Sequence, residues 1–158
     1  MALRLDVALA EVPLPNGQRS DAFARAERAA WEETGEAYRP ALLADVPLIP
    51  AHTALLTTTV YHGSNPPGIV DIVPSESPRP AGWTAALVIV DGLIGQAVDD
   101  GICQRFSHVP GMPELLLRAV SYRRYVNDLH SESRSNTRSH IERVEQHLVS
   151  RASAILER

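Results

Sequence analysis

Apolar and polar residues alternate in residues 3–12, which predicts a half-buried strand because the side chains of a strand point alternately to its two faces. Two prolines and a glycine then predict a loop over residues 13–17. The pattern changes at Ser20, a residue type suited to cap a helix, and the Ala-rich stretch that follows places its apolar residues near helical spacing. We expect a helix over about 21–34.

The middle of the chain favours strands and loops. Residues 53–61 are rich in β-branched side chains, which fit a pleated strand better than a helix. Residues 62–79 contain four prolines and two glycines, so we expect a long loop with at most a short strand at 69–73. Residues 84–98 fit either a buried strand or a buried helix, because a continuous apolar run has no period that separates the two. A further strand is expected over 102–109.

Two amphipathic helices are predicted in the C-terminal third. The first begins at Pro113, because proline is tolerated in the first turn of a helix, and carries an apolar stripe to about residue 130. The second begins at Ser139, which has capping-box spacing to Glu142. Its narrow stripe consists of Ile141, Val144, Leu148, Ala152 and Ile155. This helix is too short for an independent coiled coil, so its stripe packs either on its own domain or on a second subunit.

These elements predict an α/β fold class, with α+β as the alternative. We expect a small mixed β-sheet with two packed helices in residues 1–111, and a two-helix extension in residues 112–158. The chain of 158 residues is long enough to bury a hydrophobic core of its own. The extension is expected to pack on this core or on a second subunit.

Composition narrows the setting in which the protein works. No apolar run approaches the roughly 20 residues that span a bilayer, and charge enters residues 1–6 too early for a secretory signal. We therefore expect a soluble, cytoplasmic protein with no membrane partner. Cys103 is the only cysteine, which excludes disulfides within the chain and a zinc site built on several cysteines. The residue is expected to be a small buried apolar side chain.

Charge is distributed unevenly, and all 15 basic residues are arginines. Residues 1–102 hold 13 acidic residues and 6 arginines, net −7, whereas residues 103–158 hold 6 acidic residues and 9 arginines, net +3. A polyanion would meet the second segment more readily, although an ordinary solvated helix face also explains it. Between two tyrosines lie Arg123 and Arg124, which either contact phosphates or are simply solvated. The candidate DNA-binding residues are Arg79, Arg105, Arg123 and Arg124.

One acidic pair indicates possible metal chemistry. The chain has no Walker A loop, no GxGxxG, GxSxG or HExxH motif and no paired CxxC. Asp99 and Asp100 follow an apolar segment, and two adjacent carboxylates repel each other unless water at an exposed turn or a divalent cation relieves the repulsion. Magnesium would need a further carboxylate nearby, and the only acids in residues 46–98 are Asp71, Glu76 and Asp91.

The order of elements and two short motifs resemble the RusA family of Holliday-junction resolvases, which is common in phages and prophages. In that family a helix with an Asp-Ala-Leu-Asn-Gly motif is followed within a few residues by Asp-Asp and a strand. Here Asp91-Gly-Leu-Ile-Gly95 and Asp99-Asp100 look like those two pieces, and the likeness extends loosely over residues 3–109. The family also carries an acidic pair before the helix. This chain reads Arg-Pro-Ala-Gly-Trp at residues 79–83 and lacks that pair.

The resemblance implies a magnesium-dependent endonuclease that acts on branched DNA, or a catalytically depleted relative that still binds DNA. The catalytic residues would then be Asp100, Asp99 and Asp91. Asp100 and Asp99 would hold Mg²⁺, and Asp71 or Glu76 from the long loop would substitute for the missing family ligands, Asp71 being the residue we select. Metal-bound carboxylates would position a water molecule for attack on a phosphodiester.

A second hypothesis comes from a different class of protein. The chain would be a non-catalytic interaction or oligomerisation module, such as a phage or accessory factor. In that case residues 139–158 would bind a protein partner or form a homodimer through the narrow apolar stripe described above.

Overall fold

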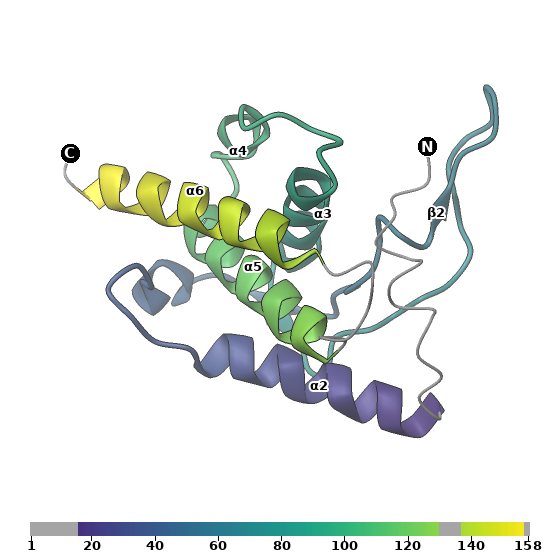
Figure 1. Cartoon of the computed structure of the whole chain (residues 1–158), viewed down its shortest axis with the longest axis horizontal. Helices are drawn as coiled ribbons and strands as arrows, with labels where there is room; N and C mark the ends of the chain where they lie inside the picture. The colour runs from purple at the N-terminus through teal and green to yellow at the C-terminus, as the bar shows by residue number, and fades with distance from the viewer. Residues whose placement is uncertain (1–15, 130–136, 157–158) are drawn as a thin grey trace.

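A computed structural model describes residues 16–129 and 137–156. These residues form a mixed α/β fold, in which helices make the body and short antiparallel strands lie beside it (Figure 1), so the predicted α/β class is confirmed. The helices are α2 (Asn16–Glu32), the 3-10 helix η1 (Pro40–Leu43), α3 (Trp83–Ile94), α4 (Ile102–Arg105), α5 (Met112–Asp128) and α6 (Arg138–Leu156). In the described part of the chain, no helix combines the length and the apolar character needed to cross a membrane.

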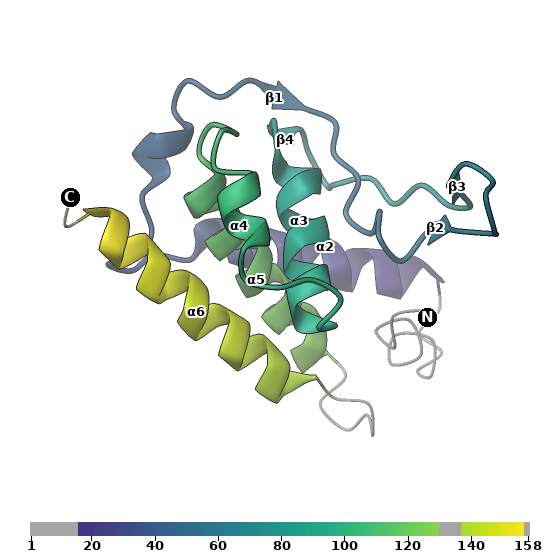
Figure 2. The ribbon, with the colours of Figure 1, turned by 90° about the horizontal axis from the view of Figure 1, so that it is seen from above.

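The strands form two small antiparallel ladders. β1 (Leu48–Ile49) pairs with β4 (Arg79–Pro80), and this ladder lies against the helical body. β2 (Thr59–Val60) pairs with β3 (Gly68–Ile69), and this second ladder projects away from the helices (Figure 2). The long segment between η1 and α3 therefore leaves the helical body after β1, forms the projecting β2–β3 ladder, and returns to the body at β4.

α5 is the central helix of the core. It packs against α2, α3 and α6, and Leu115, Ala119 and Val120 on it are completely buried. One cluster of buried apolar residues extends from Ala26 in α2 to Ala152 in α6. The two helices of residues 112–158 therefore pack on the same core as α2 and α3.

α3 resolves the ambiguity of residues 84–98 in favour of a helix. Most of its residues are buried, including Leu87 and Val90, so the sequence shows no polar face from which a helical period could be read. Trp83, at its first position, is completely buried and meets Trp31 of α2 edge to face, with ring centroids 5.0 Å apart. The helix is thus enclosed on nearly every side by the core.

The predicted strand over 53–61 is wrong except at its end, where Thr59 and Val60 form β2. The hydroxyls of Thr57 and Thr58 both donate to the carbonyl oxygen of Ala54 at 3.0 Å. The hydroxyl of Thr59 donates to the carbonyl oxygen of Leu55 at 2.6 Å. Local bonds from side chain to backbone compete with the ladder of a strand, so the β-branched threonines support turns here.

The predicted strand over 102–109 is also wrong, because Ile102–Arg105 form the short helix α4 and turns follow it. Its apolar residues lie at positions 102, 103, 106 and 109, which is the spacing of a helix and not the alternation of a strand. Cys103 is 4% exposed, as expected of a buried apolar residue. The RusA resemblance predicts a strand after Asp99-Asp100, and α4 occupies that place.

The long amphipathic helices are confirmed as α2, α5 and α6, and the ends of α5 lie within two residues of those predicted. The predicted start of α2 is wrong, because the helix begins at Asn16 and Ser20 lies inside it and does not cap it. Four residues of the predicted α6 stripe are buried against the core of the same chain: Ile141, Val144, Leu148 and Ala152. These side chains are therefore not available as a seam for a second subunit, which corrects that part of the prediction. The strand predicted over 3–12 and the side chain of Ile155 lie outside the described residues.

Candidate functional site

Asp91, predicted as a catalytic carboxylate, is a buried member of an ion pair. It lies on α3 and is 1% exposed. Arg123 of α5 donates to both of its carboxylate oxygens, with Nε 2.5 Å from Oδ1 and Nη2 2.6 Å from Oδ2. The same Nη2 donates to the carbonyl oxygen of Thr53 at 2.8 Å. The pair thus ties α3 and α5 to the segment that follows β1.

Asp99 and Asp100 lie in the exposed loop between α3 and α4. The Oδ1 atom of Asp99 accepts a hydrogen bond from the backbone N–H of Gly101 at 2.8 Å. The Oδ2 atom of Asp100 lies 3.7 Å from Nδ1 of His147 on α6. The repulsion between the two carboxylates is therefore relieved by water at an exposed turn, which is the first of the two interpretations considered for this pair.

Asp71, predicted as a substitute metal ligand, is exposed on the segment after β3, and its Oδ1 atom accepts the backbone N–H of Ile72 at 2.8 Å. Among residues 16–129 and 137–156, no group of three or more His, Cys, Asp or Glu side chains is arranged to hold a metal ion. The structure therefore does not bring Asp71, Asp99 and Asp100 together as a ligand set for Mg²⁺.

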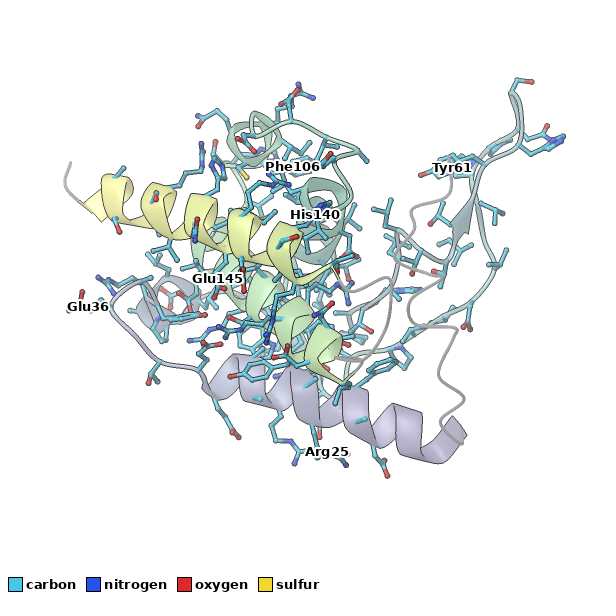
Figure 3. All side chains as sticks on the ribbon, viewed as in Figure 1. Arg25, Glu36, Tyr61, Phe106, His140 and Glu145 are labelled. Atoms are coloured by element: carbon cyan, nitrogen blue, oxygen red, sulfur yellow. The ribbon has the colours of Figure 1, made fainter. Side chains whose placement is uncertain are left out.

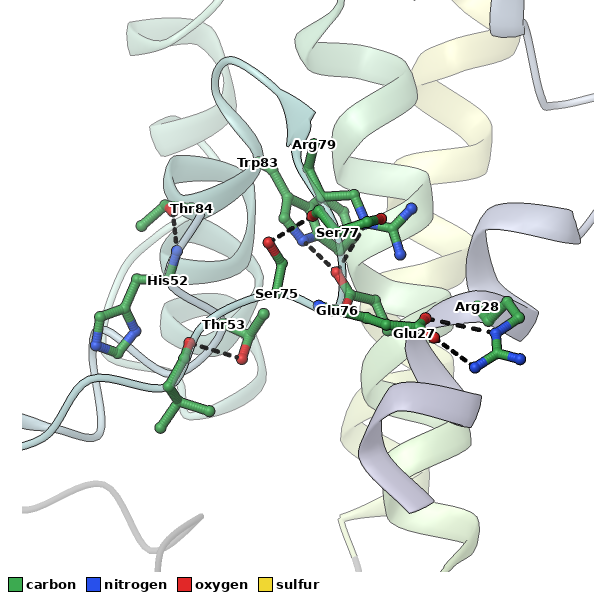
Figure 4. Close-up of polar contacts among 11 residues, drawn as sticks. Glu27, Arg28, His52, Thr53, Ser75, Glu76, Ser77, Arg79, Trp83 and Thr84 are labelled. Atoms are coloured by element: carbon green, nitrogen blue, oxygen red, sulfur yellow. Dashed lines mark hydrogen bonds and ion pairs between the residues drawn. The ribbon is translucent and has the colours of Figure 1, made fainter. Parts of the chain in front are cut away.

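Glu27 is the centre of a buried polar network between α2 and the start of α3 (Figure 4). Its carboxylate is 3% exposed and accepts three hydrogen bonds. Nε of Arg79 and Nε1 of Trp83 donate to Oε1 at 3.0 and 3.2 Å, and the backbone N–H of Glu76 donates to Oε2 at 2.9 Å. Arg79, predicted to bind DNA, is thus held inside the protein.

Arg118 holds the C-terminal end of α2. Its Nη1 atom donates to the carbonyl oxygens of Ala30 at 3.0 Å, Trp31 at 3.2 Å and Glu33, groups that a helix end leaves without partners. Its Nε atom donates to Oε1 of Glu114 at 2.8 Å, and both side chains are almost fully buried. A third internal charge network therefore fixes α2 on α5.

Arg124 joins three elements at the surface of the bundle. Its Nη2 atom donates to both carboxylate oxygens of Glu33, at 2.5 and 2.7 Å, and Nη1 donates to Oε1 of Glu145 on α6 at 3.1 Å. Of the four arginines predicted to bind DNA, only Arg105 is largely exposed, with Nη2 3.9 Å from Oδ2 of Asp99. The predicted set therefore does not form one basic surface.

The Glu145 carboxylate gives a pH-dependent test of this cluster. Burial raises the pKa of Glu145, Arg124 lowers it and Glu33 raises it further, with a net upward shift. The folded protein then holds this proton more tightly than the unfolded chain, so the Glu145 contribution to stability falls as the pH rises through the interval between the two pKa values. We expect Glu145→Gln to be as stable as the parent or more stable at neutral pH. Thermal unfolding from acid to neutral pH measures this, and a clear loss at neutral pH would contradict it.

Residues 54–72 form an extended apolar arm outside the helical body, and Tyr61 marks it in Figure 3. The arm contains β2 and β3. Five of its large apolar side chains are 51–75% exposed: Val60, Tyr61, Ile69, Val70 and Ile72. Soluble proteins rarely leave contiguous apolar surface in water unless it binds something. The apolar arm is therefore the candidate binding surface of this protein.

The base of the apolar arm is closed by hydrogen bonds. The backbone N–H of Thr53 donates to the carbonyl oxygen of Val73 at 2.8 Å. The ring of His52 accepts the backbone N–H of Ala54 on Nδ1 at 3.1 Å, and Nε2 lies 3.0 Å from the carbonyl oxygen of Asp71. With Nδ1 as an acceptor, Nε2 carries the proton and donates it to that carbonyl. The two ends of the arm are thus held together where they leave the body.

The geometry defines a helix-rich α/β protein with a projecting apolar arm. Comparison of the chain with known protein families, with curated proteins and with solved structures finds no match. The arrangement of this chain's own residues therefore carries the functional assignment.

The sequence-based prediction missed the apolar arm as a surface, because most of it was assigned to a long loop. A signal was present. Residues 46–70 contain no Asp, Glu, Lys or Arg, in a chain of which 22% is charged, and they include several β-branched residues. A charge-free apolar segment that is too rich in proline for the core is a candidate binding surface.

Proposed function

We propose that the protein is a non-catalytic interaction module that associates with a second copy of itself through the apolar arm. The observation that carries this proposal is the exposure of its five large apolar side chains. Removing apolar surface from water contributes roughly 25 cal/mol per Å². An arm of this kind gains stability when another surface covers it.

The backbone of the arm supports the same function. β2 pairs with β3 along one edge, and within the described residues neither strand has a partner along its other edge. A free strand edge offers N–H and C=O groups to another strand. Two copies related by a twofold axis would pair the same edge with itself, as a symmetric dimer requires.

Charge favours a second copy over a charged partner. In a twofold dimer a surface meets its own copy, so charges at its centre would repel each other. The arm has no Asp, Glu, Lys or Arg from Ala54 to Val70, although the whole chain has a net charge of −4. A nucleic acid would require a basic surface, and three of the four candidate arginines are engaged in internal ion pairs: Arg79, Arg123 and Arg124.

We also propose that the module works in the cytoplasm. Cys103 is buried as a free thiol, and unpaired cysteines suit a reducing compartment. This location stays a prediction until the protein is localised in cells.

Val60→Asp is expected to convert a dimer of the parent chain into a monomer. Val60 is 51% exposed in β2, so the substitution leaves the core intact, and a dimer would have to bury one unpaired carboxylate from each copy. Sedimentation velocity over a dilution series measures the change. The matched control is Val149→Asp on α6, where the valine is 37% exposed and lies outside the arm.

The expected pattern is a parent and a Val149→Asp variant that both dimerise with rising concentration, and a Val60→Asp variant that does not. A parent chain that stays monomeric at every soluble concentration would overturn the proposal. Equal loss of association in both variants would show that the interface lies elsewhere.

A further inference from the structure

A pocket of about 630 Å³ lies between α4, the start of α5 and the C-terminal half of α6. Its floor is apolar and buried: Met112, Leu116, Leu148 and Ala152. Its rim is polar: Gln104, Ser107 and Arg151. Pockets that bind small molecules have volumes in the range of ~300–1,000 Å³ and combine an apolar lining with a few polar groups. This pocket is separate from the apolar arm.

Arg151 is the charged group of the pocket. It is half-buried on α6, and within the described residues no hydrogen bond or ion pair engages its guanidinium. Six other arginines of the described chain pair with a carboxylate within 3.1 Å: Arg28, Arg79, Arg118, Arg123, Arg124 and Arg138. A half-buried guanidinium without a counter-ion leaves five N–H donors for an anion.

Cys103 shows that the charge of Arg151 acts inside the pocket. Burial raises the pKa of the Cys103 thiol, and the positive charge of Arg151 opposes this by lowering the pKa. The guanidinium of Arg151 therefore lies close enough to act on a side chain of the pocket lining. Asp100 raises the pKa of the same thiol, but it is not part of the lining and its carboxylate faces Nδ1 of His147. Among the described residues, the only charged side chain of the pocket lining is therefore a cation.

We infer that this pocket binds a small amphipathic monocarboxylate, with its carboxylate on Arg151 and its apolar body on the floor formed by Met112, Leu116 and Leu148. The planar guanidinium matches a carboxylate with two parallel hydrogen bonds. A single cation matches one negative charge, so a nucleotide or a polyphosphate fits this lining poorly. The extent of the apolar floor suits an aliphatic chain of medium length, such as that of a medium-chain fatty acid.

The inference is tested on the full chain with decanoate as the probe. Isothermal titration calorimetry should show saturable binding of decanoate. Decanol has the same chain without the charge, and because a charge-assisted hydrogen bond is lost it should bind about tenfold or more weakly. Acetate has the charge without the chain and should not bind measurably. Arg151→Gln should remove the preference for decanoate over decanol.

The matched control is Arg25→Gln, the same substitution at an exposed position on α2 (labelled in Figure 3), and no described residue of α2 lines the pocket. It should leave the affinity for decanoate unchanged. Because Cys103 is the only cysteine of the chain, its rate of alkylation reports the occupancy of this pocket. Decanoate should slow alkylation of the parent, and the same concentration should slow it much less in Arg151→Gln.

Three results would overturn the inference. The first is no saturable binding of decanoate, and the second is equal affinity for decanoate and decanol. The third is an Arg151→Gln variant that keeps the parent's preference. All three are independent of self-association, because the Val60→Asp variant should bind decanoate as the parent does.

Discussion

Arg123→Met is expected to lower the free energy of unfolding by about 3–5 kcal/mol, because it leaves the carboxylate of Asp91 buried without its counter-ion. Arg123 supplies two hydrogen bonds to that carboxylate, and one of its nitrogens also holds the carbonyl oxygen of Thr53. A buried polar group that loses its partner retains its full cost of desolvation. Urea unfolding followed by circular dichroism measures the loss.

Two further variants separate the buried charge from a general effect of losing an arginine. Arg28→Met breaks an exposed ion pair with Glu76 and should cost less than about 1 kcal/mol. The double variant Asp91→Leu, Arg123→Met removes both charges and should recover much of the loss, because apolar residues often replace buried ion pairs without destabilisation. If Arg123→Met unfolds at the same urea concentration as Arg28→Met, the buried pair does not stabilise the fold.

Glu27→Gln is expected to cost about 2–4 kcal/mol, although the two side chains have nearly the same shape. The carboxylate accepts hydrogen bonds on both oxygens, from Arg79, Trp83 and the backbone of Glu76. An amide offers one oxygen and one NH₂ group, so in either orientation a donor faces a donor. Arg79 also loses the charge that compensates its own burial.

Thermal unfolding and the fluorescence of the two tryptophans measure this second effect, since Trp83 is one of the donors. The control is Glu32→Gln, the same change at an exposed position of the same helix, which should stay within about 0.5 kcal/mol of the parent. Equal stability of the two variants would contradict the role assigned to Glu27.

The helices could be predicted from the sequence because their apolar residues recur with a helical period. α2 and α6 each have one face in the core and one in water, so their buried positions can be recognised from the order of residue types. α5 is buried along most of its length, but its buried positions include Glu114, Arg118 and Arg123, and these charged residues interrupt the apolar run so that a helical stripe can still be read. α3 could not be separated from a strand, because it is enclosed on nearly every side and the period disappears.

The strands were harder to predict than the helices, because residues typical of strands form hydrogen bonds from side chain to backbone in turns. Thr57, Thr58 and Thr59 use their hydroxyls to stabilise turns before β2, so the residue type that favours a strand forms turns here. The ladders that do form are two residues long on each strand, shorter than any alternating pattern can define.

The candidate site was predicted least well, because the role of a charged residue depends on a partner far away in the chain. Asp91 and Arg123 are 32 residues apart, and Glu27 and Arg79 are 52 apart. A count of local charge treats each arginine as a free cation, whereas folding neutralises Arg79 and Arg123 inside the protein. Of the four arginines predicted to bind DNA, only Arg105 is largely exposed, and nothing in the sequence around it distinguishes it from the other three.

The closed base of the apolar arm allows the chain to change in length at the tip of the arm. Thr53 is held by Arg123 and Val73, and Glu76 by Glu27, so the core itself sets the distance between the two ends of the arm. The entropy of closing a loop grows only slowly with its length once the ends are fixed. Insertions or deletions near Gly63 and Asn65, at the turn between β2 and β3, should therefore change the reach of the arm while leaving the helical body as it is.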